Sequence, residues 1–320
     1  MKEIGGYFGL ELGPVNQDYP FRDMIHLNSG RHALEYILMH IEHKPEKIYI
    51  PYYTCEVVLE PLLRLGIPYS FYHINERMEL AVPIELKANE YIIANNYFGI
   101  KDRYMEKLHD QYGEYLIIDE AQALFHKPLV GARHFYSPRK FVGVPDGGFA
   151  VTWDTSTISL TRDFSTDRAL HLLRRIDAGA QSGFNEFRKN DSALTKESLK
   201  IMSHLTTELL ERMDYSSIIN KRQENFKTLH NALCSYNGLD LTFEMDFQCP
   251  LVYPYLTADN LLRNRLIENK VYVARYWPNV YEWCNEDSFE YTLADRMLPL
   301  PIDQRYSKED MERIISMIIP

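Results

Sequence analysis

The fold is decided by the stretch FYSPRKFVGVPDGG, residues 135–148. Its lysine, Lys140, stands five residues before a Pro-Asp-Gly-Gly turn signal that begins at Pro145. The run FAVTW that follows, residues 149–153, is typical of a β-strand. Lys140 is therefore expected in a loop between two sheet elements, where its amine can face a ligand, and not on a solvated helix face.

Two further segments can be combined with this lysine. Asp119 ends an apolar strand predicted at residues 115–118, and Ser29 belongs to the run NSGR, residues 28–31, which predicts a helix start. Singly, each has an ordinary explanation: a surface lysine, a strand-end carboxylate and a helix N-cap. Together they supply an amine, a carboxylate and a helix N-terminus that can bind phosphate. Pyridoxal phosphate (PLP) needs all three, because its pyridine nitrogen must stay protonated and its aldehyde must meet an amine.

The sequence resembles the fold-type-I PLP enzymes and, within them, the DegT-like sugar aminotransferases. The matching motifs are collinear over most of the chain: SGRHAL at 29–34, IYIPYYT at 48–54, DEAQA at 119–123, SPRKFVGVPDGG at 137–148 and GFNEFR at 183–188. Some positions depart from the family pattern. Cys55 stands where the family has an aromatic ring that stacks on the cofactor, so Tyr53 or Tyr52 would have to substitute. Ser137 precedes the lysine by three residues instead of the usual five, and Pro145 replaces a glycine.

The resemblance implies a fold-type-I α/β transferase with two domains. A large PLP-binding domain, residues 1–235, would hold a mainly parallel, seven-stranded-type sheet flanked by helices, and residues 236–320 would form a small C-terminal α/β domain. The periodicity agrees, because β-branched and aromatic runs alternate with helical patterns up to about residue 160. Beyond that point the pattern is mostly helical, interrupted by a loop at 178–183, and a strand is predicted at 271–274.

The resemblance also implies roles for single residues. Lys140 and Asp119 would be catalytic: Lys140 would bind the cofactor covalently and then move a proton, and Asp119 would face the pyridine nitrogen. The implied cofactor-binding residues are Ser29, Gly30, Arg31, Tyr53, Cys55, Asp119, Gln122, Ser137, Lys140 and Asn185. Asn185 would reach the phosphate in the neighbouring subunit. Arg275 and Tyr276 would face the substrate, since arginine suits bidentate capture of a carboxylate or phosphate.

Composition narrows the class of protein. The net charge of −10 argues against nucleic acid or an anionic membrane as a general partner. The four cysteines show neither metal-ligand spacing nor a disulfide framework, so reduced thiols in a cytoplasm are expected. No metal site is expected, and His126, which precedes Lys-Pro, is expected in a loop without a role. No run approaches the roughly 20 apolar residues that a membrane helix needs.

The sequence therefore predicts a cytoplasmic, homodimeric PLP-dependent aminotransferase with small-molecule substrates. By the resemblance, it would transfer an amino group from an amino acid such as glutamate to a keto sugar nucleotide, in surface-polysaccharide or related biosynthesis. Two alternatives stay open. One is a PLP enzyme on the same scaffold that acts on an amino acid or another amine. The other is a non-catalytic PLP-fold protein that binds a partner.

Overall fold

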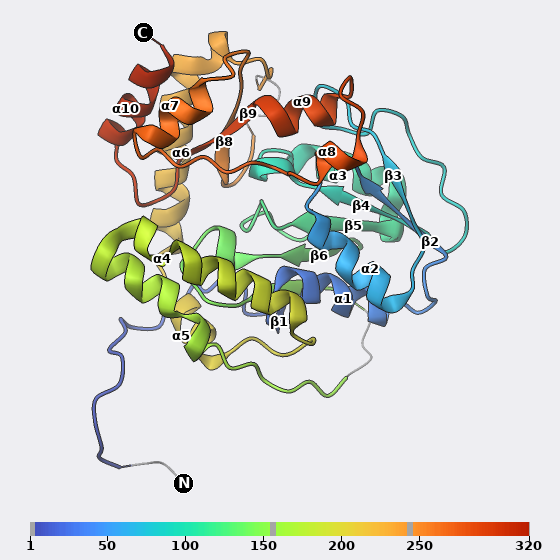
Figure 1. Cartoon of the computed structure of the whole chain (residues 1–320). Coiled ribbons are helices and arrows are strands. Elements are labelled where there is room, and N and C mark those ends of the chain that lie inside the picture. Colours follow the sequence, from blue (N-terminus) through green and yellow to red (C-terminus); the bar gives the residue numbers. More distant parts are fainter. Residues whose placement is uncertain (1–3, 154–157, 242–245, 320) are drawn as a thin grey trace.

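A seven-stranded sheet forms the centre of the computed structural model, which describes residues 4–153, 158–241 and 246–319 (Figure 1). The strand order is β1-β7-β6-β5-β4-β2-β3. The strands are β1 (Ile25–Leu27), β2 (Lys47–Pro51), β3 (Tyr69–Tyr72), β4 (Glu90–Asn95), β5 (Leu116–Glu120), β6 (Arg133–Tyr136) and β7 (Gly148–Val151). Neighbours from β3 through β6 are parallel, whereas β7 is antiparallel to both β6 and β1. The prediction of a mainly parallel sheet of seven strands is confirmed.

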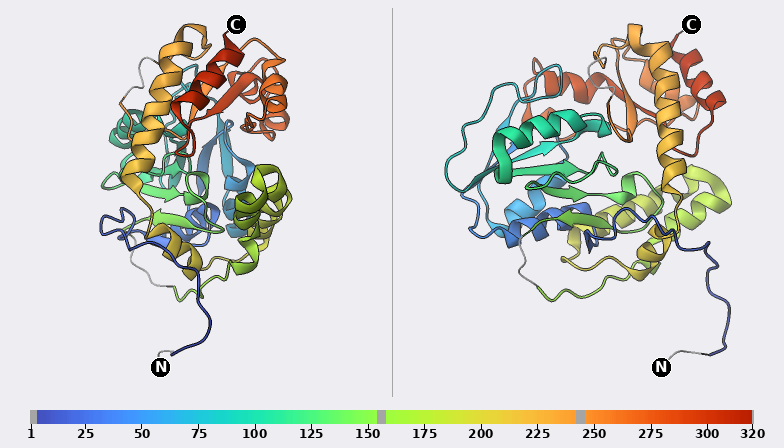
Figure 2. Two further views of the ribbon diagram at one scale, coloured as in Figure 1. Left: turned by 90° about the vertical axis from the view of Figure 1, so that its left-hand side faces the viewer. Right: turned by 180° about the vertical axis from the view of Figure 1, so that it is seen from behind.

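Helices cover both faces of this sheet and build most of the C-terminal part. They are α1 (Gly30–His40), α2 (Leu59–Leu65), α3 (Asp102–Tyr112), α4 (Leu170–Lys196), α5 (His204–Leu210), α6 (Tyr215–Leu233), α7 (Leu262–Glu268), α8 (Val280–Trp283), α9 (Phe289–Arg296) and α10 (Lys308–Ile318). Figure 2 shows α3 on one side of the sheet and α4 on the other. Lys140 lies between β6 and β7, at the end of a 3-10 turn, Pro138–Lys140.

The two faces of the sheet belong to different buried clusters, because side chains alternate along a strand. Ile93 and Ile117 pack in the cluster that contains the apolar residues of α1 and α2. Ile92 and Ile118 pack in the cluster that contains the apolar residues of α3. Along β5 the same alternation places the side chain of Asp119 with that of Ile117 and the next residue, Glu120, on the opposite face.

The small C-terminal sheet differs from the prediction. Its strands are β8 (Val252–Leu256) and β9 (Met297–Pro301), which pair antiparallel. The strand predicted at 271–274 is wrong: Val271 and Val273 are buried alternately, as in a strand, but the segment is unpaired coil. The guanidinium of Arg263 donates to the carbonyls of Val273 (3.3 Å) and Ala274 (2.7 Å) and so replaces a neighbouring strand.

The two parts of the chain share a core. One buried cluster contains Ile92 and Leu116 of the large sheet together with Leu298 of β9 and Met311 of α10. Helix α6 joins the parts, since Arg222 Nη1 donates to the carbonyl of Leu251 (2.9 Å) beside β8. The boundary near residue 235 stays a prediction, and it divides the chain at the end of α6.

The loop predicted at 178–183 is a sharp turn inside α4. Only Ala178 and Gly179 leave helical geometry, and Gly179 has a φ of +80°. The chain resumes its helix at once, and Gly183 packs so closely that a Cβ there would lie 2.7 Å from the carbonyl oxygen of His171. The prediction missed this because small residues are equally typical of loops and of close helix contacts. Asn185 consequently lies on a helix, and its side chain is exposed.

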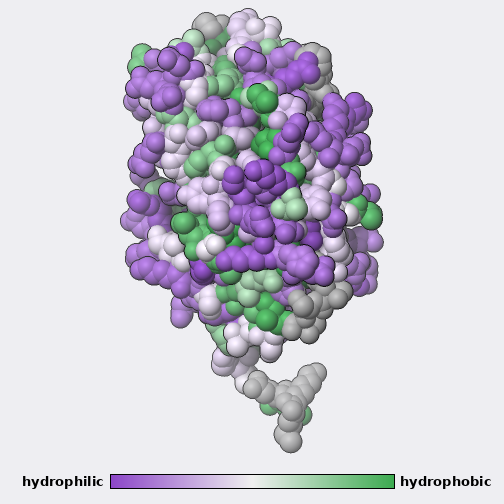
Figure 3. Space-filling view, turned by 90° about the vertical axis from the view of Figure 1, so that its right-hand side faces the viewer, coloured by the Kyte–Doolittle hydropathy of each residue, from purple (hydrophilic) through white to green (hydrophobic). Residues whose placement is uncertain are grey.

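The surface agrees with the charged composition. Figure 3 shows one face on which hydrophilic residues predominate and apolar residues are scattered. Across the described ranges, no helix is both long and apolar enough to cross a membrane.

Candidate active site

Two of the predicted cofactor residues, Asp119 and Ser29, lie near the carboxyl ends of the parallel strands. Asp119 on β5 pairs in register with Asn95, the last residue of β4. Ser29, which caps α1, forms a β-bridge with Gly147 in the loop that follows Lys140. Ligands of open α/β sheets bind at this edge, so these residues form the candidate site.

Lys140, Asp119 and Cys55 share one electrostatic environment. Burial raises the pKa of Asp119 to about 6, and the Lys140 ammonium and the Ala121 N–H, at 2.8 Å from Oδ1, oppose this rise. Burial also raises the pKa of the Cys55 thiol, again against the charge of Lys140. The side chain of Lys140 is exposed, so its amine is open to a ligand. The amine and the carboxylate that PLP requires therefore lie close together.

Two glycines allow the lysine loop to touch the start of α1. A Cβ on Gly148 would lie 2.2 Å from the carbonyl oxygen of Ser29, so only glycine fits there. A Cβ on Gly30 would lie 3.3 Å from the Cβ of Ser137 and 3.8 Å from its Oγ. Ser137 therefore stands beside the N-terminus of α1 despite its short spacing from Lys140. Its hydroxyl and the N-terminus of α1 form a cradle suited to phosphate.

The side chain of Arg31 has other partners. Its Nη1 donates to both carboxylate oxygens of Glu60 at 2.8 Å and to the Thr195 hydroxyl at 2.6 Å. The main-chain N–H of Arg31, in the first turn of α1, is the group that remains for an anion.

Asp146 anchors the lysine loop, a role that the sequence analysis missed. Its fully buried carboxylate accepts the N–H (2.8 Å) and hydroxyl (2.7 Å) of Ser203 and the hydroxyl of Thr206, at the start of α5. The second half of α4 holds the same loop, because Asn190 donates to the carbonyl of Pro145 at 2.7 Å. Neither contact has a local sequence signal, since the partners lie far along the chain.

Gln122 carries a hydrogen-bond donor that no described residue accepts. Its Oε1 accepts the N–H of Phe98 at 2.9 Å, which fixes the amide, whereas the buried Nε2 has no partner among the residues that the structure describes. Within the same part of the chain, the Oδ1 atom of Asn95, beside Asp119 in the sheet register, is also buried without a partner. Buried polar groups are normally satisfied, so these two atoms indicate that a polar ligand belongs here. The residues present therefore fit PLP.

The aromatic candidates for stacking on the cofactor are engaged elsewhere. The ring of Tyr53, which is fully buried, contacts Tyr97 and Trp277 at centroid distances of 5.5 and 4.9 Å. The ring of Tyr52 stacks on Phe71 at 4.7 Å. Of the residues considered for this position, Cys55 is the one whose pKa is influenced by both Lys140 and Asp119.

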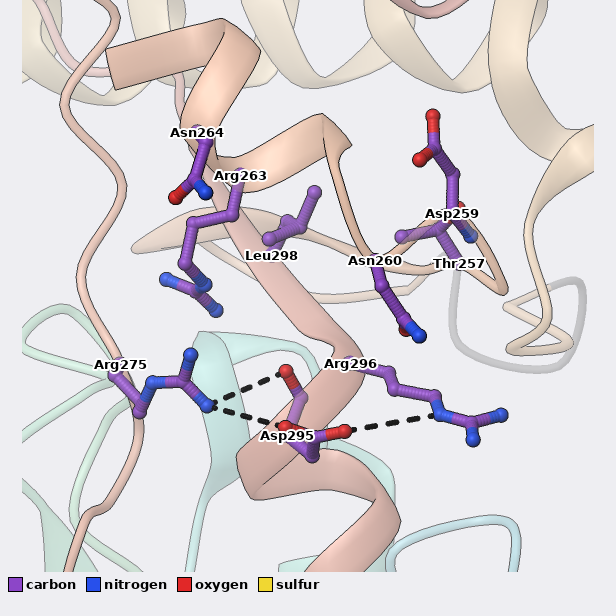
Figure 4. Close-up of a pocket in the computed structure, with 9 residues that line it drawn as sticks. All are labelled: Thr257, Asp259, Asn260, Arg263, Asn264, Arg275, Asp295, Arg296 and Leu298. Atoms are coloured by element: carbon purple, nitrogen blue, oxygen red, sulfur yellow. Dashed lines mark hydrogen bonds and ion pairs between the residues drawn. The ribbon is translucent and has the colours of Figure 1, made fainter.

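The two predicted substrate residues lie in different surroundings. Burial raises the pKa of Tyr276 to about 12, and Cys55 adds to this rise. Arg275 instead pairs with Asp295 at 3.4 Å and lines a polar cavity of about 360 Å³ in the C-terminal part. Figure 4 shows Arg275 and Arg263 directed into this cavity.

Comparisons with known proteins identify the fold. No protein-family model matches the sequence, and no curated protein matches it. Among solved structures, the fold is that of fold-type-I sugar aminotransferases of the DegT kind, as the sequence predicts.

Three of these structures illustrate the similarity. The sugar aminotransferase CalS13 from Micromonospora echinospora is 15% identical, with a TM-score of 0.60 over 92% of this chain and 86% of that one. A DegT DnrJ EryC1 StrS aminotransferase from Brucella abortus is 16% identical, with a TM-score of 0.61 over 92% and 84%. NtdA from Bacillus subtilis, with bound cofactor PMP, is 15% identical, with a TM-score of 0.63 over 93% and 74%.

Proposed function

We propose that this protein is a PLP-dependent aminotransferase that acts on a sugar substrate. One observation carries the proposal: the charge of Lys140 acts on the buried carboxylate of Asp119, and the loop that follows Lys140 touches the start of α1. The neighbours of the same fold support it, because they include sugar aminotransferases and a protein with bound PMP.

The residues divide the work. When bound, PLP supplies an electron sink for the bond that breaks at the substrate Cα. Lys140 would hold the cofactor through its aldehyde and would move a proton at the substrate Cα. Asp119, whose carboxylate accepts the N–H of Ala121, is largely ionised at neutral pH with a pKa of about 6 and would keep the pyridine nitrogen protonated. Ser29, Gly30, Arg31 and Ser137 would hold the phosphate, the first three at the positively polarised end of α1.

For the substrates, we propose glutamate or a similar amino acid as donor and a keto sugar nucleotide as acceptor. The setting would be surface-polysaccharide or related biosynthesis in the cytoplasm. Tyr276, whose pKa is influenced by Cys55, would contact the substrate. Arg275 would act from the cavity in the C-terminal part, which Arg263 also lines.

We also propose that the protein works as a homodimer. Helix α4 exposes several large apolar side chains: Leu173 (54% exposed), Ile176 (81%), Phe184 (56%) and Phe187 (43%). Apolar side chains gathered on one helix are typical of an interface. Asn185 lies among them. If a second chain packs on α4, Asn185 of the first chain would approach the phosphate cradle of the second chain.

The decisive experiment is chemical labelling of the cofactor lysine. The protein is reconstituted with PLP, reduced with borohydride and mapped by peptide mass spectrometry. The adduct is expected on Lys140, with none in the Lys140→Ala variant. The half-reaction with glutamate, followed by addition of keto sugar nucleotides, then tests the substrates. Label on another lysine contradicts the site, and protein that binds PLP but stays inert toward every amino donor supports the non-catalytic alternative.

A further inference from the structure

A cluster of buried ionisable residues lies directly behind Asp119, on the other face of β5. Glu120 is fully buried, and its Oε1 contacts Nδ1 of His126 at 2.6 Å and Nδ1 of His134 at 3.1 Å. Its second oxygen accepts the amide of Asn96 at 3.0 Å. The same amide donates to Asp102 at 2.8 Å. These residues are not part of the amine and carboxylate pair described above.

The hydrogen bonds settle the charges within the cluster. The N–H of Leu129 donates to Nε2 of His134 at 3.0 Å, so this nitrogen is an acceptor and the proton sits on Nδ1. His134 is therefore a neutral donor to Glu120. Burial acts to lower the pKa of His126, but the charge and hydrogen bond of Glu120, with the charges of Asp102 and Glu106, outweigh burial and raise the pKa to about 9. His126 is therefore the cation that balances Glu120.

The same protonation argues against a metal ion. Glu120, His126 and His134 offer three ligand atoms within 4.8 Å of one another. A metal would need the lone pair of His134 Nδ1, and the proton displaced to Nε2 would then oppose the N–H of Leu129. The cluster is better suited to holding the chain than to holding an ion.

The Glu120–His126 pair closes a segment of chain on itself. After β5 the chain turns, with the N–H of Ala123 donating to the carbonyl of Glu120 (2.9 Å) and the N–H of His126 donating to the carbonyl of Ala123 (3.0 Å). The ion pair then joins the first residue of this turn to the last. Asp119 immediately precedes the closed segment, and Gln122 lies inside it.

We propose that the Glu120–His126 ion pair is a clamp that positions Asp119 and Gln122 for the cofactor. A buried ion pair stabilises a protein less than apolar packing of the same volume. It does restrict the local conformation, because any conformation that separates the two buried charges costs free energy. Asp119 and Gln122 need such a restriction, since Asp119 takes one hydrogen bond from the described protein and Gln122 is held through one oxygen. Glu120 and His126 are thus positioning residues, and their role rests on the function proposed above.

The test compares E120Q, H126Q and the double variant E120Q/H126Q with a matched control, E290Q. Glu290 is also a buried glutamate bonded to a histidine, His73 at 3.1 Å, but it lies on α9. Hydrogen–deuterium exchange of the cofactor-free protein is measured first. The two single variants should exchange the amides of residues 121–126 at least about tenfold faster, with α1 and β4 unchanged, because local opening alone is affected. E290Q should leave this segment as in the wild type.

Kinetics of the PLP-loaded protein give the second readout. H126Q should lower kcat of the amino-donor half-reaction by about tenfold and leave KM for the donor within about twofold, because the donor does not touch the clamp. If a single variant does not fold, the double variant decides, since it leaves no unpaired buried charge; its segment should still exchange faster than in the wild type. Folded variants with wild-type exchange and kcat overturn the proposal. The exchange measurement needs no cofactor, so it stands even if PLP proves absent from Lys140.

Discussion

Asp119 and Glu120 are adjacent carboxylates on one strand, but they lie on opposite faces of the sheet and their pKa values shift in opposite directions. For each carboxylate, burial is the largest single influence on the pKa and acts to raise it. On the α1 face the pKa of Asp119 stays raised, at about 6, whereas on the α3 face His126 and His134 bring the pKa of Glu120 below its ordinary value. On the α3 face, the charge of Glu120 is therefore balanced by protein side chains. On the α1 face, the protein balances the charge of Asp119 only in part, as is typical of a ligand site.

The largest effect is expected on the α1 face. Lys140→Ala should slow the amino-donor half-reaction by about 10²–10⁴-fold, the usual contribution of a positioned acid–base group. Because the side chain is exposed, the free energy of unfolding should change by less than about 0.5 kcal/mol. Single-turnover kinetics and denaturant unfolding measure the two quantities, with the exposed Lys227→Ala on α6 as control. A large loss of stability in Lys140→Ala would contradict the view that the α1 face serves the reaction and the α3 face serves stability.

On the α3 face the expected effect is on stability and depends on pH. The pKa of His126 is raised from 6.5 to about 9, so its contribution is complete below pH 6.5 and is lost as pH rises through 9. The loss should reach roughly 3 kcal/mol of unfolding free energy. Glu120, whose pKa is lowered, acts in the opposite direction and loses its contribution as pH falls below 4.5.

Denaturant unfolding of the cofactor-free protein between pH 6 and 10 checks this expectation. H126Q should be less stable than the wild type at pH 6, and the difference should shrink toward pH 10. Parallel curves for the two proteins would show that His126 does not carry the charge assigned to it.

Replacing Asp119 should affect the reaction more than cofactor binding. Asp119→Asn keeps the shape of the side chain but cannot hold the pyridine nitrogen protonated. We expect the half-reaction to lose roughly 1.5–3 kcal/mol of transition-state stabilisation while PLP occupancy is largely kept. Absorbance titration with PLP and single-turnover kinetics separate the two effects. An unchanged rate would make Asp119 an ordinary strand-end carboxylate.

The smallest effect is expected on PLP binding, through Asn185 contributed by a second chain. Asn185→Ala should weaken PLP binding by about 0.5–1.5 kcal/mol, the contribution of one hydrogen bond. Mixing Asn185→Ala with Lys140→Ala should restore at most about a quarter of the sites, because half of randomly paired dimers are mixed and each has one intact site of two. Sedimentation with and without PLP reports the assembly. A fully active, PLP-saturated monomer would refute the shared site.

The sequence predicts the parts of the site that depend on local geometry. Ser29 is recognisable as a helix cap, and Asp119 lies at the end of an apolar strand. Lys140 precedes a turn whose Gly148 permits the approach to α1. Each of these positions is set by residues close by in the chain, so a pattern can reveal it.

Contacts between distant segments are not visible in the same way. The guanidinium of Arg31 is occupied by Glu60, and the ring of Tyr53 packs on Trp277. His126 does lie in a loop, as predicted, but its side chain is buried and forms an ion pair with Glu120. The segment 271–274 has the alternation of a strand, and periodicity does not show that Arg263 takes its carbonyls.

Because one buried cluster spans the large sheet and the C-terminal elements, we expect the chain to unfold as one cooperative unit. A cut near residue 235 would pass through a single buried cluster and leave on each fragment an apolar surface that the other now covers. Heating the intact chain should therefore melt the sheet and α10 together. Binding that stabilises the lysine loop is then expected to protect the far C-terminal helix as well, so that occupancy of the site can be detected at the opposite end of the sequence.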